Sequence, residues 1–128
     1  MNTAITTDKA PPAFSDYAVA VDAPSHSRWV HVSGQVGVSP TGDLAETAKG
    51  QHQQAWTNIF AILDAANMDR TDIVEVIGIV TDHAQVALYR EMRDVMLQGH
   101  LCASTLLVCG LANPDWKVEI AVRAAKAG

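Results

Sequence analysis

The sequence has few charged residues, few aromatic residues and no long apolar run, and these shortages exclude several classes of protein. Its 128 residues contain no run of Lys or Arg and carry a net charge of -5 at pH 7. Because phosphate contacts dominate nucleic-acid affinity, this balance argues against a nucleic-acid-binding protein. No stretch approaches the roughly 20 apolar residues of a membrane-spanning helix, and the N-terminus lacks the pattern of a signal peptide. We expect a cytoplasmic protein without nucleic-acid or membrane partners.

Cysteine is also scarce, with only Cys102 and Cys109. Seven positions apart on a predicted strand, they would lie roughly 23 Å apart at about 3.3 Å per residue, too far for a disulfide. Reduced thiols agree with a cytoplasmic location. The five histidines have no zinc-like spacing with one another or with either cysteine, so the sequence predicts no metal site.

The chain does contain clear apolar periodicity. Its length predicts a single domain spanning 1–128. We expect the polar lead-in over 1–12 to be flexible. The patterns predict helices over 47–66 and 84–98 and strands over 17–21, 29–33, 73–80, 104–111 and 118–123. This order predicts an α+β fold, in which a mixed sheet carries both helices on one face.

Two of the predicted strands, Ile73–Val80 and Ser104–Leu111, are apolar on both faces. Such runs indicate burial on both sides of a sheet. Two helices cover only one face, and no further element of the chain is free to cover the other. The sequence therefore predicts a homo-oligomer that packs through its sheets, and the alternative is a monomer with a half-exposed sheet.

A carboxylate stands out on the last predicted strand. Val118, Ile120 and Val122 point to one side of it, which places Glu119 and Arg123 on the other side. Glu119 is therefore either a functional carboxylate or an ordinary solvent-facing residue, and an ion pair with Arg123 along the strand is possible.

Two further features are weaker signals. Ser33-Gly34-Gln35 ends an apolar strand in a polar corner, whose backbone N–H groups can face an anionic ligand, although strand-ending turns often look alike. Cys102 lacks a convincing base beside it, so the pattern favours a buried, inert thiol over a nucleophile.

A set of segments, in this order and spacing, resembles one known family from about residue 17 to residue 125. The matching pieces are Tyr17, Val32–Val36, Ile59–Ala66, Asp72–Val76, Thr81-Asp82, Ser104–Leu106, Leu111 and Val118–Ile120. The family is RidA, also called YjgF or endoribonuclease L-PSP-like.

The resemblance implies a chorismate-mutase-like fold and a homotrimer with ligand clefts between neighbouring subunits. Active members hydrolyse small enamines and imines, such as 2-aminoacrylate, to ammonia and a 2-keto acid, without a metal or an organic cofactor. By resemblance, Glu119 positions and activates the water. The cleft is then lined by Tyr17, Ser33, Gly34, Cys102, Ala103 and Ser104.

The chain departs from the family pattern at one position that matters for binding. The family carries an arginine directly before the residue aligned with Ser104, where it holds the substrate carboxylate, and this chain has Ala103. Losing that clamp costs about 1.5–3 kcal/mol per hydrogen bond. Arg123 and Arg28 are candidate replacements.

Three functions remain open after this departure. The first is a deaminase-like hydrolase with altered specificity, and the second is a non-catalytic trimer that binds a small metabolite or regulates a partner. The third, a ribonuclease, is disfavoured by the acidic charge.

Overall fold

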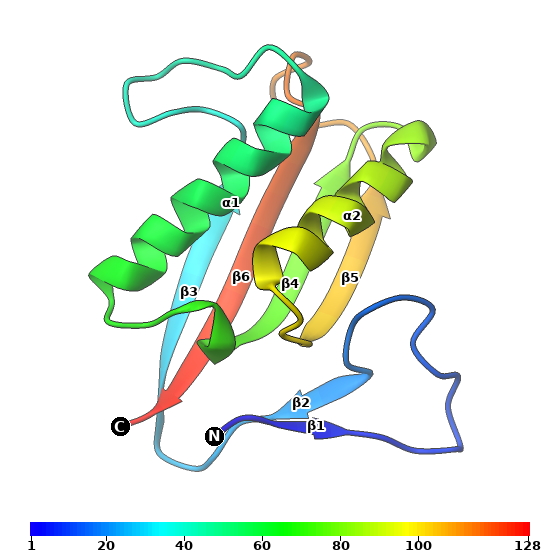
Figure 1. Ribbon diagram of the computed structural model, residues 1–128, viewed down its shortest axis with the longest axis vertical. Helices are drawn as coiled ribbons and strands as arrows, with labels where there is room; N and C mark the ends of the chain where they lie inside the picture. The colour runs from blue at the N-terminus through cyan, green and yellow to red at the C-terminus, as the bar shows by residue number, and fades with distance from the viewer.

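A four-stranded sheet carries two helices on one of its faces in the computed structural model, which describes residues 1–128 (Figure 1). The strand order is β3-β6-β4-β5; β4 and β5 run parallel and the other neighbours antiparallel. The strands are β3 Ser27–Gln35, β4 Ile73–Val80, β5 Ala103–Val108 and β6 Val118–Ala127. The predicted α+β fold, a mixed sheet with both helices on one face, is confirmed.

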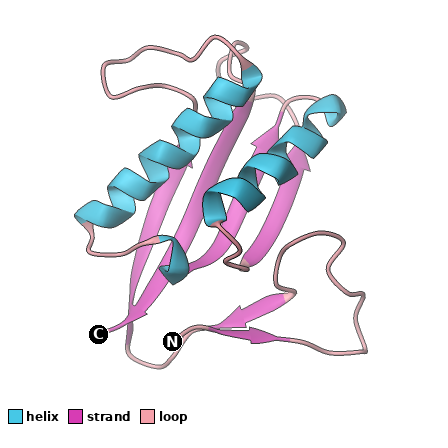
Figure 2. Ribbon diagram, viewed as in Figure 1, coloured by secondary structure: helices cyan, strands magenta, loops and turns pink.

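The helices α1 Ala48–Ala65 and α2 Val86–Leu97 lie side by side across the sheet (Figure 2). Thr47 caps α1, because its side chain accepts a hydrogen bond from the backbone N–H of Gly50. Short 3₁₀ turns, η1 Arg70–Asp72 and η2 His83–Gln85, lead into β4 and α2. Neither helix has the length and hydropathy that a membrane crossing requires.

The core lies between the helices and the sheet. On β4, Val76 and Val80 are buried beneath the helices, and Gly78 between them makes room for Tyr89 of α2. A Cβ at position 78 would overlap the Tyr89 ring. The small residue on the strand and the large one on the helix therefore interlock.

The N-terminal part differs from the prediction. The strand predicted at 17–21 is shorter and later, β2 Ala20–Asp22, and it pairs with β1 Thr3–Ile5 in a separate two-stranded sheet. Strand β1 lies within the lead-in 1–12, whose flexibility stays a prediction. At the other end of the chain, β5 and β6 follow each other in sequence, but β4 lies between them in the sheet.

The face of the sheet away from the helices is uncovered within the chain, and we call it the open face. Trp29 and Leu107 are 46% and 48% exposed there. The strand pairings and the alternation of burial place these residues on it: Trp29, His31, Ser33, Glu75, Ile77, Ile79, Ala103, Thr105, Leu107, Glu119, Ala121 and Arg123.

Candidate active site on the open face

A β-bulge in β3 shapes the open face next to β6. The pairing of the two strands shifts between Val32 and Gln35, so that Ser33 and Gly34 together oppose Ala121 alone. A bulge of this kind bends its strand and redirects the side chains beside it. The polar corner noticed in the sequence is therefore a bulge inside a strand rather than the end of one.

Glu119 lies beside this bulge, on β6 between the buried residues Val118 and Ile120. A Cβ built at Gly34 would overlap the carboxylate group of Glu119. The carboxylate thus packs directly on the Gly34 backbone, half-buried rather than free in solvent. Glycine at position 34 leaves space for the carboxylate in this position, and any larger residue there would have to move it.

One row of pairing partners on the open face crosses all four strands and has a pair of charged residues at its centre. His31, Arg123, Glu75 and Ala103 are successive pairing partners on β3, β6, β4 and β5. The Arg123 guanidinium forms an ion pair with Glu75. The pair of Arg123 with Glu119 that the strand pattern allowed is therefore replaced by a cross-strand pair.

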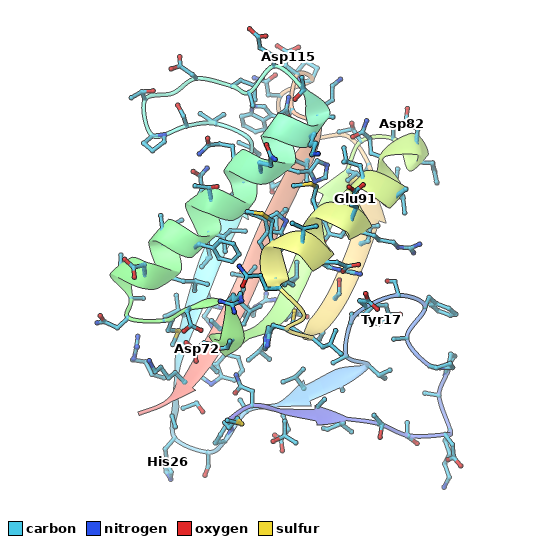
Figure 3. The ribbon with its side chains drawn as sticks, in the orientation of Figure 1. Tyr17, His26, Asp72, Asp82, Glu91 and Asp115 are labelled. Carbon is cyan, nitrogen blue, oxygen red and sulfur yellow. The ribbon has the colours of Figure 1, made fainter.

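A second group of candidate residues lies at the start of β5. Ala18 pairs with Ala103, and its N–H donates to the Cys102 carbonyl over 2.9 Å. Tyr17 therefore lies beside the start of β5, as Figure 3 shows. Its hydroxyl accepts a hydrogen bond of 3.1 Å from the Phe14 N–H.

Two of the candidates, Cys102 and Ser104, face the helices instead of the open face. Cys102 is buried in the core, and burial raises the pKa of its thiol to about 12. This agrees with the expectation of an inert thiol. The Ser104 hydroxyl lies 3.4 Å from Nη1 of Arg93 on α2. The structure therefore does not bring these two side chains to Glu119.

Arg93 is a residue that the sequence reasoning missed. It is only 3% exposed, and its Nε donates to Asp94 over 3.0 Å. Its Nη2 donates to the Ser15 hydroxyl over 3.2 Å, and its guanidinium lies 5.9 Å from the centre of the Tyr17 ring. Arg93 of α2 thus holds the segment that contains Ser15 and Tyr17 against the helix.

A sequence signal for this burial existed. Tyr89, Arg93 and Leu97 recur every four residues on α2, and all three are buried. Val95, an apolar residue on the same helix, is instead 60% exposed.

The two groups of candidates are far apart within one chain. Ala103 pairs with Glu75, and Glu119 pairs with Ile79, four residues further along β4. At about 3.3 Å per residue and about 4.8 Å per strand, their Cα atoms are roughly 16 Å apart. One small ligand cannot touch both residues of the same chain.

Comparison with known proteins places this chain in a family. The family model described as endoribonuclease L-PSP matches residues 7–126. The chain belongs to the RidA family. This RidA-family chain is 39% identical over 124 residues to a 2-iminobutanoate/2-iminopropanoate deaminase of Salmonella typhimurium, covering 94% of each chain. It is 35% identical over 122 residues to the deaminase of the same name of Rattus norvegicus, covering 91% of this chain and 84% of that one.

Solved structures of the RidA family agree with the fold. RidA from an Antarctic Psychrobacter is 32% identical, with a TM-score of 0.72 and coverage of 97% of this chain and 99% of the other. A Rid-family protein of Yersinia pestis reaches a TM-score of 0.86 at 24% identity, covering 98% of both chains. The second likeness concerns the fold alone.

Proposed function

We propose that this RidA-family chain is a hydrolase of small imines and enamines, acting at a cleft between copies of the chain. The observation that carries the proposal is the Glu119 carboxylate, held half-buried over the Gly34 bulge on the open face. The names of the relatives support the reaction class, because two of them at 35% and 39% identity are 2-iminobutanoate/2-iminopropanoate deaminases.

One carboxylate is enough for this chemistry. Glu119 accepts a proton from a water molecule as the water oxygen attacks the carbon of the C=N bond, and Glu119 then passes this proton to the former imine nitrogen. In the resulting carbinolamine, Glu119 carries the hydroxyl proton to the nitrogen, the C–N bond breaks as the C=O bond forms, and ammonia leaves. The balance is one imine and one water to one carbonyl compound and one ammonia, so the carboxylate is regenerated. An enamine first takes a proton on carbon to become the imine.

The proposed cleft needs two chains, because Ala103 and Glu119 are roughly 16 Å apart in one chain. A neighbouring copy that packs on the open face can bring its own Tyr17 and the start of its own β5 close to Glu119. This arrangement also covers Leu107 and Trp29, which are both exposed in the single chain. A second copy is therefore the occupant that we propose for the open face, in the homotrimer that the resemblance implies.

The expected mass in solution is three times the 13.7 kDa of the chain at micromolar concentration. Sedimentation equilibrium measures it. Leu107→Glu places a charge in the proposed interface and should shift the mass toward the monomer, whereas Val95→Glu, exposed on α2, should leave it unchanged. A wild-type monomer would contradict the shared cleft.

The hydrolase is tested with imines made in situ. An L-amino-acid oxidase converts 2-aminobutanoate or alanine to the imino acid, and amines with a suitable oxidase supply imines without a carboxylate. Addition of the protein should accelerate the loss of at least one imine above the protein-free rate. Equal rates with and without protein across this panel would refute the hydrolase.

Ala103 favours a second candidate, a trimer that binds a metabolite without converting it. No cation stands at that position to hold a carboxylate in the family's manner. Thermal-shift measurements with 2-keto acids separate the two functions, since stabilisation without turnover of any imine indicates a binding protein.

A further inference from the structure

A hollow on the open face lies between β3 and β6, and its lining residue Ala121 is two residues from Glu119 along β6. Its volume is about 140 Å³, and it is lined by His31, Val32, Ser33, Ala121, Val122 and Arg123. We propose that this hollow is the carboxylate site of the enzyme and that Arg123 holds the acid group of a small carboxylate-bearing imine or enamine. This inference rests on the proposed hydrolase and names its substrate class.

The donors around the hollow suit a carboxylate. Glu75 engages only Nη1 of Arg123, which leaves the Nε–Nη2 edge with two parallel N–H groups for a bidentate contact. His31 is the pairing partner of Arg123 across the strands, and its exposed imidazole adds a donor. Ser33, which also lines the hollow, carries a hydroxyl that can donate as well.

The hollow lies close enough to Glu119 for one imino acid to reach from one to the other. Ala121 lines it midway along β6 between Arg123 and Glu119, each about 7 Å away on the same face, so the long Arg123 side chain has to span part of the roughly 13 Å between the Cα atoms of Arg123 and Glu119. Ser33 also lines it, and the next residue, Gly34, touches the Glu119 carboxylate. A ligand whose carboxylate occupies the hollow therefore places its C=N carbon within reach of a water molecule on Glu119.

The other arginines near the sheet are used elsewhere. Arg28, one of the two candidate replacements, donates from Nη2 to the Ala66 carbonyl over 2.8 Å, at the end of α1. Arg93 is buried against Asp94 behind β5. Arg123 lies on the same face as Glu119, so the anchor would have moved from β5 of the family to β6 of this chain.

When no ligand is bound, Glu75 is the ion-pair partner of Arg123. The side chains of Arg123 and Glu75 are 44% and 34% exposed, and ion pairs so open to solvent are weak. A substrate carboxylate can therefore bind Arg123 beside Glu75, or in place of Glu75, at a small cost in free energy. We expect Glu75→Gln to tighten binding of anionic ligands.

The test compares Arg123→Gln with wild type on two kinds of imine. For the 2-iminobutanoate made in situ, KM should rise about tenfold or more with kcat changed by less than about threefold, because the loss is of ground-state binding. For an imine without a carboxylate, both constants should stay the same. Arg123→Lys should be intermediate and Glu75→Gln should lower KM, while Arg90→Gln, exposed on α2, should match wild type.

Calorimetry with 2-oxobutanoate, a keto-acid product, separates the two proposals. Unchanged KM in a hydrolytically active Arg123→Gln enzyme would overturn the anchor and leave the hydrolase standing. If wild type hydrolyses no imine, the hydrolase fails, and a loss of 2-oxobutanoate binding in Arg123→Gln would still support the anion site. Equal 2-oxobutanoate binding by wild type and Arg123→Gln, or no binding by wild type, would overturn the anion site. If Arg123→Gln fails to fold, Arg123→Lys and Glu75→Gln decide.

Discussion

Replacing Glu119 with Gln is expected to lower kcat for imine hydrolysis by about 10²–10⁴-fold. The amide keeps the size of the side chain but cannot accept the proton of the attacking water. The substrate anchor is separate from this carboxylate, so KM should change much less. Steady-state rates of imine loss with the in situ assay measure both constants. Far-ultraviolet circular dichroism should show the same fold, because Glu119 lies outside the core cluster.

A matched pair of glycine variants tests the placement of the carboxylate. Gly34→Ala introduces a Cβ that overlaps the carboxylate of Glu119 and should displace it, reducing kcat while the side chain remains ionisable. Gly110→Ala meets nothing within 4 Å and should keep wild-type kinetics. A Glu119→Gln enzyme as active as wild type would remove the general base from the mechanism, and a fully active Gly34→Ala enzyme would remove the positional requirement.

Periodicity predicted the parts of the fold that depend on local pattern. The strand predicted at Ile73–Val80 has those bounds in the structure, and the helix predicted over 47–66 runs over Ala48–Ala65. The alternation along β6 correctly placed Glu119 and Arg123 on the face opposite Val118. These features follow from which side chains each element buries, and a single segment carries that information.

The missed features depend on contacts between distant segments. The insertion of β4 between β5 and β6 is a pairing choice that neither strand encodes alone. The bulge at Ser33 and Gly34 follows from the register with β6. The hollow beside Arg123 exists only once that register is known, so the sequence offered Arg123 as a candidate without a reason to prefer it to Arg28.

His52 shows a different limit of sequence reasoning. It lies on the apolar stripe of α1, a position typical of a core histidine with satisfied hydrogen bonds, and its side chain is fully buried. Neither ring nitrogen has a hydrogen-bond partner within the chain. Its ring packs edge-on against Tyr89 with centroids 6.2 Å apart. Burial lowers the pKa of His52 from 6.5 to about 4.

This shift makes the folded state sensitive to mild acid. Above pH 6.5 the imidazole is neutral in both folded and unfolded chains, so the full stability is present. Between pH 6.5 and pH 4 the unfolded chain takes up a proton that the folded chain excludes, and stability falls with falling pH. The expected loss is about 3 kcal/mol by pH 4, on the scale of 1.36 kcal/mol per pKa unit.

Urea unfolding at a series of pH values and one fixed protein concentration measures this loss. His52→Leu removes the titrating group and should flatten the decline between pH 6.5 and pH 4, whereas His83→Gln, exposed on η2, should retain it. The pKa of Asp69 is lowered from 3.8, first by the hydrogen bond of its side chain with Thr71. Protonation of Asp69 therefore reduces stability only below about pH 3.8, outside this window. Equal pH slopes in wild type and His52→Leu would show that the buried imidazole does not set the acid sensitivity.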